Sequence, residues 1–311
     1  MTRISAFIAP FFLSGHIVSG EYSPIRLFLM RIFARYIEVP LLHLSYLACV
    51  GRLKFLSKFF LTRWLIVYPI AYPFGHWGDT GRPVPLNELV EMVEGLEGRL
   101  AVGPCRCRIG HKACDHPMEA DIVIKTGTDV WLEAFPNEYR VIDREEAVRI
   151  IRDCSEQGLF HMVFLHCLLG GAVNEYVICN CCTDGCVPYI LNRSLGQPVY
   201  PLVRGEWRVE VDPALCLGCG ECVKACPFSA RRLRDGVSEV LDCFGCGLCV
   251  WRCPVGASVI AKRTWQNQIS LAPAAPLLLT RPDKTLEEAP TVNRERYQAG
   301  GNVQCPGRIL S

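Results

Sequence analysis

The sequence has little net charge. Its 33 lysine and arginine residues nearly balance its 31 aspartate and glutamate residues, so the formal net charge is only +2 over 311 residues. A surface that binds nucleic acid through phosphate contacts usually shows a basic excess. We therefore expect no nucleic-acid partner.

Nucleotide and flavin signatures are also missing. The sequence contains no dinucleotide fingerprint, no P-loop and no flavin motif. A chain without these motifs lacks the two-electron cofactor on which flavin and nicotinamide reductases depend. This absence argues against a self-contained reductase.

Long hydrophobic runs are scarce, although half of the residues are apolar. Residues 4–20 carry no charge, but they contain Pro10 and His16, are short for a span and lack a cleavage site of small residues, so we expect neither a signal peptide nor a membrane span there. The apolar residues up to position 80 are interrupted mainly by basic ones, and a helix is expected over residues 24–38. This helical segment should pack on the rest of the chain, dock on a partner subunit or lie on a membrane surface.

Cysteine is the abundant residue, with nineteen in the chain. Fifteen of them fall into four tight clusters, in residues 105–114, 179–186, 216–226 and 243–253. Thiols so close in sequence suit metal ligation better than disulfide bonds. Clustered free thiols also indicate a reducing compartment, and we expect a cytoplasmic protein, with membrane association through residues 1–80 left open.

The last two clusters repeat one pattern, Cys-x2-Cys-x2-Cys-x3-Cys-Pro, over residues 216–227 and 243–254. Each loop is able to place three thiolates around one cubane while the cysteine before proline reaches the other cubane. Glycines between the cysteines allow the sharp turns that aim backbone amides at sulfur.

This repeat resembles the two-cluster bacterial ferredoxins over residues 209–262. The resemblance implies two 4Fe-4S clusters and single-electron transfer. It assigns one cluster to Cys216, Cys219, Cys222 and Cys253, and the other to Cys243, Cys246, Cys249 and Cys226.

The first two clusters contain seven cysteines, which are Cys105, Cys107, Cys114, Cys179, Cys181, Cys182 and Cys186. This pair of segments resembles the extra domain found ahead of dicluster ferredoxin modules in iron-sulfur proteins of anaerobic bacteria and archaea. The resemblance favours Cys105, Cys107, Cys179 and Cys182 as ligands, with the other three as alternates. With His111 and His116 nearby, the residues allow a third iron-sulfur cluster, a structural zinc or a redox-active thiol group, and we expect the two cysteine-rich loops to converge.

The expected fold class is α+β. Helical periodicity predicts a helix over residues 86–98, and Asp143 with Glu146 forms a capping box for a helix to about residue 158, in which Cys154 faces the core. Short apolar runs predict strands at residues 100–102, 122–124 and 130–135, and further strands at residues 211–214 and 237–241. The expected organisation is a helical segment (residues 1–80), a cysteine-rich α+β domain (81–200), the dicluster module (201–263) and an extended or disordered tail (264–311).

These observations favour an electron-transfer protein or subunit that passes single electrons between a donor protein and a partner oxidoreductase. One alternative is a reductase whose N-terminal metal site binds substrate. Another is a sensor of redox state or metal.

Overall fold

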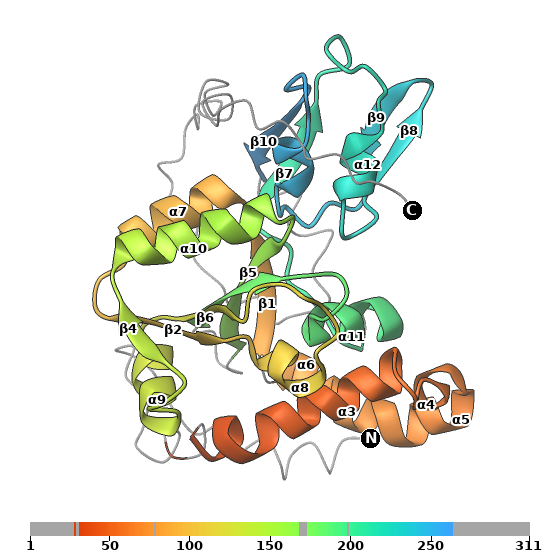
Figure 1. Cartoon of the computed structure of the whole chain (residues 1–311). Coiled ribbons are helices and arrows are strands. Elements are labelled where there is room, and N and C mark those ends of the chain that lie inside the picture. Colours follow the sequence, from red (N-terminus) through yellow and green to blue (C-terminus); the bar gives the residue numbers. More distant parts are fainter. Residues whose placement is uncertain (1–27, 29–30, 78, 168–172, 198, 264–311) are drawn as a thin grey trace, which may run out of the picture.

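The protein is described here from a computed structural model, which covers residues 28, 31–77, 79–167, 173–197 and 199–263. Figure 1 shows a helical segment at one end, a mixed domain in the middle and a small module at the other end. The tail over residues 264–311, Cys305 and residues 24–27, 29 and 30 of the helix expected at residues 24–38 lie outside the described residues, and residues 31–38 of that helix are helical. The described chain mixes helices with antiparallel sheets, so the expected α+β class is confirmed.

A six-stranded sheet forms the centre of the middle domain, with the strand order β1-β5-β6-β3-β2-β4 and antiparallel pairing throughout. Its strands are β1 (Asp79–Val84), β2 (Leu100–Pro104), β3 (Glu119–Val123), β4 (Arg140–Ile142), β5 (Phe160–Cys167) and β6 (Val173–Cys181). Side chains alternate between the faces of such a sheet, so each face packs against its own layer of helices.

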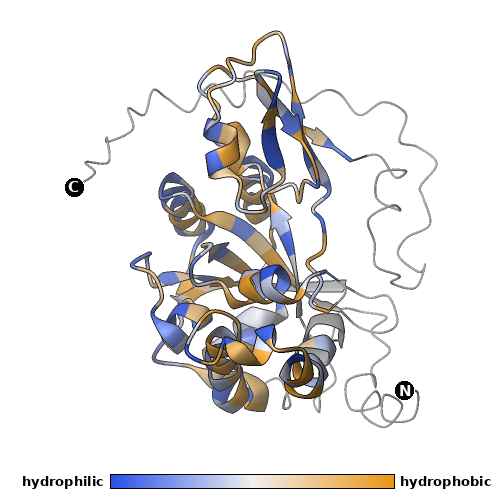
Figure 2. Ribbon diagram, turned by 90° about the vertical axis from the view of Figure 1, so that its right-hand side faces the viewer, coloured by the Kyte–Doolittle hydropathy of each residue, from blue (hydrophilic) through white to orange (hydrophobic). Residues whose placement is uncertain are grey.

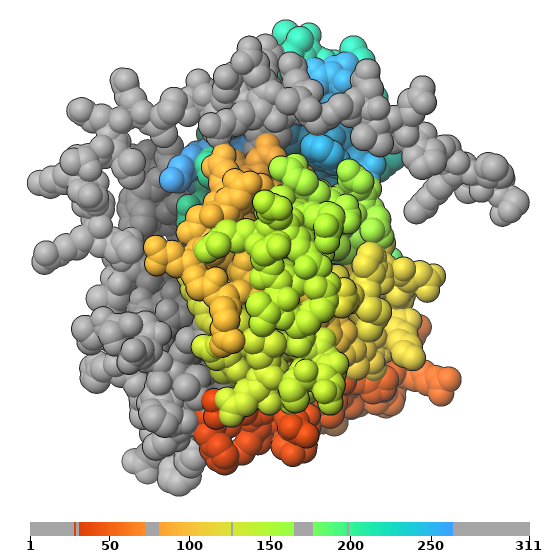
Figure 3. Space-filling view, turned by 60° about the vertical axis from the view of Figure 1, so that its left-hand side comes forward, coloured from red at the N-terminus to blue at the C-terminus, as the bar shows by residue number. Residues whose placement is uncertain are grey.

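One face is covered by α7 (Leu86–Glu94) and α10 (Arg144–Glu156), which lie side by side in Figures 1 and 3. Their apolar sides pack on sheet residues such as Ile122 and Ile178. The expected cap is present, because the Asp143 carboxylate accepts a hydrogen bond of 2.7 Å from the Glu146 amide. Cys154 is buried in this layer, as predicted.

The opposite face carries α3 (Val39–Cys49), α8 (Arg106–His111), α9 (Thr126–Ala134) and α11 (Val187–Leu195). The strand predicted at residues 130–135 is wrong, because most of this run belongs to helix α9. Val130, Trp131 and Ala134 are buried at helical spacing, and a short apolar run fits this arrangement as well as it fits a strand.

The described part of the N-terminal segment is built from helices. It consists of the π-helical stretches η1 (Phe33–Glu38) and η2 (Arg63–Val67) and the α-helices α3, α4 (Phe55–Lys58), α5 (Phe60–Thr62) and α6 (Tyr68–Trp77). It is joined to the middle domain by ion pairs, including one of 3.0 Å between Arg106 and Glu38. Figure 2 shows much hydrophobic ribbon along these helices. Within the described ranges, no helix is both long and apolar enough to cross a bilayer.

The C-terminal module contains two two-stranded sheets and two short helices. Its elements are β7 (Trp207–Val211), α12 (Glu221–Ala225), β8 (Arg231–Arg234), β9 (Val237–Val240), α13 (Leu248–Trp251) and β10 (Ser258–Lys262). Strand β7 pairs with β10, and β8 pairs with β9. The strand predicted at residues 237–241 is confirmed. The strand predicted at 211–214 lies earlier, at Trp207–Val211, because residues 213–215 form a turn that begins with Pro213.

Candidate metal centres

The module gathers its eight motif cysteines into two groups. Cys216, Cys219, Cys222 and Cys253 line a common cavity of about 20 Å³. The fourth member of this group comes from the second repeat. The chain therefore places four sulfur ligands around one space, which fits a cluster held across both repeats.

The second group forms around Cys226. This residue lies within electrostatic range of Cys243 and Cys249, and Cys246 in turn lies near Cys226, Cys243 and Cys249. Burial raises the pKa of the Cys249 thiol to about 12 when no positive metal neutralises it. A bound metal cluster supplies the positive charge that such buried thiolates need.

Backbone amides already point at several of these sulfurs. The amide of Gly245 donates to Cys243 Sγ at 3.3 Å, and the amide of Ala230 donates to Cys226 Sγ at 3.2 Å. Hydrogen bonds of this kind stabilise thiolates and tune the reduction potential of an iron-sulfur site.

Gly245 shows why this loop needs a glycine. Its φ is +84°, and a Cβ atom at this position would lie 2.2 Å from the Trp207 carbonyl oxygen. Both the backbone conformation and the close approach exclude a side chain. The turn that presents Cys243 and Cys246 therefore depends on Gly245.

Arg231 provides a buried positive charge between the two groups. Its guanidinium donates to Ser258 Oγ at 2.9 Å and interacts electrostatically with Cys222, Cys226 and Cys249. Burial alone would raise the pKa of Cys222, but hydrogen bonds from Ser238 and Arg231 hold it below its ordinary value.

Residues 208–254 match the family of 4Fe-4S dicluster domains. No curated protein and no solved structure matches the chain. The matched family and the clustered thiols identify a ferredoxin-type iron-sulfur module with an electron-transfer role.

The middle domain brings its two cysteine-rich segments together, at the edge of the sheet face that carries α8 and α11. Six of the seven cysteines line a single cavity of about 70 Å³, namely Cys105, Cys107, Cys179, Cys181, Cys182 and Cys186. The segments are not simple loops as expected. Cys179 and Cys181 lie on the same face of strand β6, Cys107 lies in helix α8, and Cys186 occupies the N-cap position of helix α11.

Five of these thiols follow one another in a row, in the order Cys105, Cys107, Cys186, Cys181 and Cys179, and each affects the pKa of the next. Burial raises the pKa of Cys186, but the hydrogen bonds that it accepts from two neighbouring thiols outweigh this effect and hold the pKa at about 6. At neutral pH, the apoprotein thus holds one thiolate in the middle of the row.

Cys114 and Cys182 form a separate pair. Their sulfur atoms lie 3.5 Å apart, on the other side of the buried Arg108 guanidinium. Arg108 interacts electrostatically with Cys105 as well as with this pair, and the anionic thiolates raise its pKa despite burial. The sulfur contacts therefore divide the seven cysteines into five and two, although Cys182 of the pair also lines the cavity of the other five.

Asp121 completes the thiol site and lies outside the cysteine motifs of the sequence. Asp121 is fully surrounded by protein, accepts hydrogen bonds from Tyr139 (2.6 Å) and Cys179 (3.1 Å), and has its pKa raised by burial. Its position directly before the apolar run at residues 122–124 was the sequence signal that could have indicated a buried acidic residue.

His161 is a buried residue that lies opposite Asn180 of the cysteine-bearing strand β6. It is buried on strand β5, and its Nδ1 lies 2.7 Å from Asn180 Oδ1. The side chains of His166 and Cys167 lie outside the described residues.

Proposed function

We propose that this protein is an electron relay in which a third iron-sulfur cluster in the middle domain exchanges electrons with the dicluster module. The observation that supports the relay is the position of Tyr189, which interacts electrostatically with both Cys186 and Cys226. Cys186 belongs to the middle domain, and Cys226 belongs to the module. One side chain therefore connects a thiol of each site.

The surroundings of Tyr189 make this connection rigid. Its hydroxyl donates a hydrogen bond to the Pro227 carbonyl, next to Cys226. Its ring packs against Phe160 at 5.5 Å and Phe228 at 5.8 Å, and Phe228 stacks on Phe244 at 4.4 Å. These packed rings hold Tyr189 between the two sites, which favours electron transfer through the protein interior.

The proposed ligands of the third cluster are Cys105, Cys107, Cys181 and Cys186. They are consecutive in the row of thiols around the 70 Å³ cavity. Cys179 is the last thiol of the row, and it donates a hydrogen bond to Asp121. We therefore propose that it is the fifth thiol, which does not bind the cluster. This choice replaces Cys179 and Cys182, which the family resemblance favours, with Cys181 and Cys186.

When bound, 4Fe-4S clusters accept and release one electron at a time. The ligand groups that we propose for the module keep the sequence assignment, with Cys226 and Cys253 exchanged between repeats. The Cys226 group faces Tyr189, and the other group lies farther along the module, where Cys219 is exposed.

A partner oxidoreductase or donor protein is proposed to dock beside Cys219. Leu217 is 70% exposed and lines the same cavity as Cys219, together with the exposed side chains of Leu233 and Val255. An apolar patch over a buried redox site suits a transient electron-transfer contact.

The helical segment is proposed to contact an anionic membrane surface. Its outer side carries large hydrophobic side chains, each more than half exposed, which are Tyr36, Phe55, Phe59, Phe60, Leu61 and Leu65. Exposed basic residues stand among them at Arg52, Lys54 and Lys58. Apolar contact combined with basic charge is the pattern of helices that lie in the headgroup region of anionic bilayers.

Iron analysis and electron paramagnetic resonance of anaerobically purified protein test the relay. About twelve irons per chain are expected, which is about four for each of three clusters. Cys107→Ser should remove about four of these irons and leave the ferredoxin signals intact, whereas Cys253→Ser should damage the cluster of Cys216, Cys219 and Cys222.

Tyr189→Leu tests the connection itself. It should retain all the iron and slow electron exchange between the middle domain and the module. Unchanged exchange rates in this variant, or a full iron content in Cys107→Ser, would refute the proposed relay. Turnover of a substrate without any partner would instead favour the reductase alternative.

A further inference from the structure

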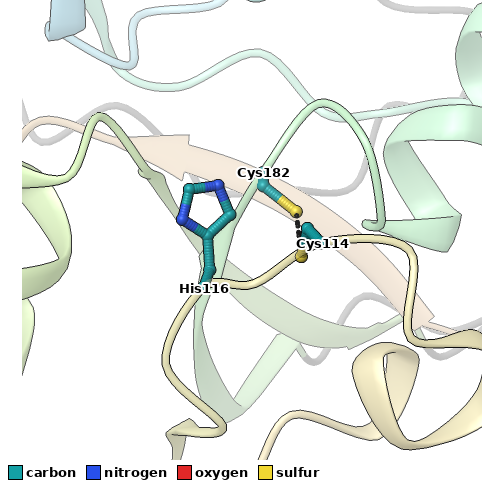
Figure 4. Close-up of side chains that lie close together, drawn as sticks. All are labelled: Cys114, His116 and Cys182. Atoms are coloured by element: carbon teal, nitrogen blue, oxygen red, sulfur yellow. Dashed lines mark hydrogen bonds between the residues drawn. The ribbon is translucent and has the colours of Figure 1, made fainter.

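We propose a mononuclear zinc site, distinct from the clusters, formed by Cys114, His116 and Cys182. The thiols of Cys114 and Cys182 and a ring nitrogen of His116 all lie within 4.8 Å of one another. Figure 4 shows the three side chains meeting from two segments that are far apart in the sequence. This inference does not depend on the proposed relay.

The spacing of the two sulfurs fits a tetrahedral metal ion. With zinc-sulfur bonds of about 2.3 Å, two thiolates on one tetrahedral zinc lie about 3.8 Å apart. The sulfur atoms of Cys114 and Cys182 are 3.5 Å apart. This separation is far longer than the bond of about 2.0 Å in a disulfide. A small shift of the side chains would admit the ion.

Charged and polar groups hold the two segments in place. Arg108 is 1% exposed and donates to the carbonyl of Pro117 and, at 2.9 Å, to the carbonyl of Asn180. Pro117 follows His116, and Asn180 precedes Cys182 by two residues. The guanidinium therefore ties together the segments that supply the ligands, and its charge stabilises nearby thiolates.

Gly185 and His111 enclose a further side of the site. A Cβ atom on Gly185 would lie 3.4 Å from each of the two sulfurs and 3.2 Å from His111 Cε1. His111 donates from Nε2 to the Gly185 carbonyl at 2.8 Å, and its ring stacks on Tyr46 at 4.0 Å. The segment after Cys182 is thus packed directly against both thiols.

Zinc is the ion that this donor set fits best. Two thiolates and one imidazole match its preference for sulfur and nitrogen ligands. No other cysteine, histidine or acidic residue of the described chain joins the three ligands in this group. The fourth position is therefore left to a non-protein ligand such as water, as in three-ligand zinc sites. Cys114 and His116 are partly accessible, so the ion has a path from solvent.

The test is elemental analysis of the full-length holoprotein, combined with X-ray absorption at the zinc edge. About one zinc per chain is expected, with two sulfur neighbours at about 2.3 Å and nitrogen or oxygen neighbours at about 2.0–2.1 Å. Cys114→Ser and His116→Gln should each weaken zinc binding at least about tenfold in competition with a chelator. His116→Cys, which again supplies a zinc-binding atom, should retain the metal.

Two controls separate this site from the clusters. Cys107→Ser should lower the iron content and leave the zinc in place, and Cys154→Ala, a buried thiol outside both groups, should change neither metal. Absence of zinc from the holoprotein would overturn the proposal. A loss of iron instead of zinc in both Cys114→Ser and His116→Gln, with the ferredoxin signals intact, would also overturn it, because these residues would then belong to the third cluster.

Discussion

Cys186 is one of the residues at which the two cysteine-rich segments meet. It accepts hydrogen bonds from Cys107 of one segment and from Cys181 of the other, and it is three residues from Tyr189, which reaches toward the module. The N-cap residue and the first turn of helix α11 thereby connect the proposed third cluster to the nearest ferredoxin cluster.

His161 illustrates the cost of a polar side chain in this core. Burial lowers its pKa to about 4, from 6.5 for an unperturbed histidine, so the folded protein keeps the ring neutral. The unfolded chain gains a proton as the pH falls below about 6.5. The resulting stabilisation of the folded state is therefore complete above pH 6.5 and is lost as the pH falls toward 4, by about 3 kcal/mol in total.

We predict that His161→Gln, which retains a polar partner for Asn180, shows a weaker dependence of stability on pH. The free energy of unfolding should fall less between pH 7 and pH 5 in the variant than in the parent protein. Chemical unfolding at both pH values measures this difference, and acid damage to the clusters is common to both proteins. An equal fall in the free energy of unfolding in both proteins would exclude His161 as the titrating group.

At the scale of secondary structure, short elements depend on neighbours that the sequence does not show. Helix α9 illustrates this, because a six-residue apolar run fits either a strand or a buried helical face. The hydroxyl of Thr128 settles the start of this helix by donating to the carbonyls of Val123 and Arg99, both at 3.0 Å. These contacts exist only once strands β2 and β3 are paired.

The loop before α13 supports a prediction at the same scale. Gly245→Ala should destabilise the module by about 2 kcal/mol or more, because the new Cβ would meet the Trp207 carbonyl and the positive φ would be strained. Iron held by the Cys226 group should be lost first. Thermal unfolding and iron analysis measure both effects.

Gly236→Ala is the matched control. Gly236 also has a positive φ, of +76°, but no atom lies within 4 Å of its Cβ position. This variant should show only the cost of the strained backbone, about 1 kcal/mol. Equal losses in the two variants would show that close contact with Trp207 is unimportant.

At the scale of the whole molecule, the proposed membrane contact and the proposed partner contact lie at opposite ends. The helical segment lies at one end, the module lies at the other, and the proposed relay runs between them (Figure 1). The exposed apolar and basic residues therefore belong to a segment at the end of the molecule opposite the module. A protein bound to a membrane through this segment would keep Leu217 and Cys219 accessible to a partner.

Binding to lipid vesicles tests the proposed membrane contact. Vesicles that contain anionic lipid should bind the protein, and purely zwitterionic vesicles should bind it less. Each basic residue near an anionic surface contributes about 1 kcal/mol, so Lys54→Gln combined with Lys58→Gln should weaken binding roughly 30-fold. Arg149→Gln combined with Arg152→Gln, on the opposite face of the domain, should have no effect; equal losses would indicate a general charge effect.

The sequence by itself determined the nature of the module. Eight cysteines and two prolines at repeated short spacing indicate a ferredoxin-type module, because ligands so near in sequence must lie close together in space. The capped helix α10 and the buried position of Cys154 were predicted correctly for the same reason, since both depend on residues that are close in sequence. These features depend on contacts within a few residues.

Only the tertiary structure decided how the seven other cysteines are divided. Cys114 and Cys182 are 68 residues apart and become neighbours through the pairing of β3 with β6, whereas Cys182 and Cys181 are adjacent in sequence but join different groups. The roles of Arg108 and Tyr189 arise in the same way, from strands and helices that meet only in the fold. Spacing along a chain specifies local geometry, while the grouping of distant thiols depends on strand order and on which face of a sheet each side chain occupies.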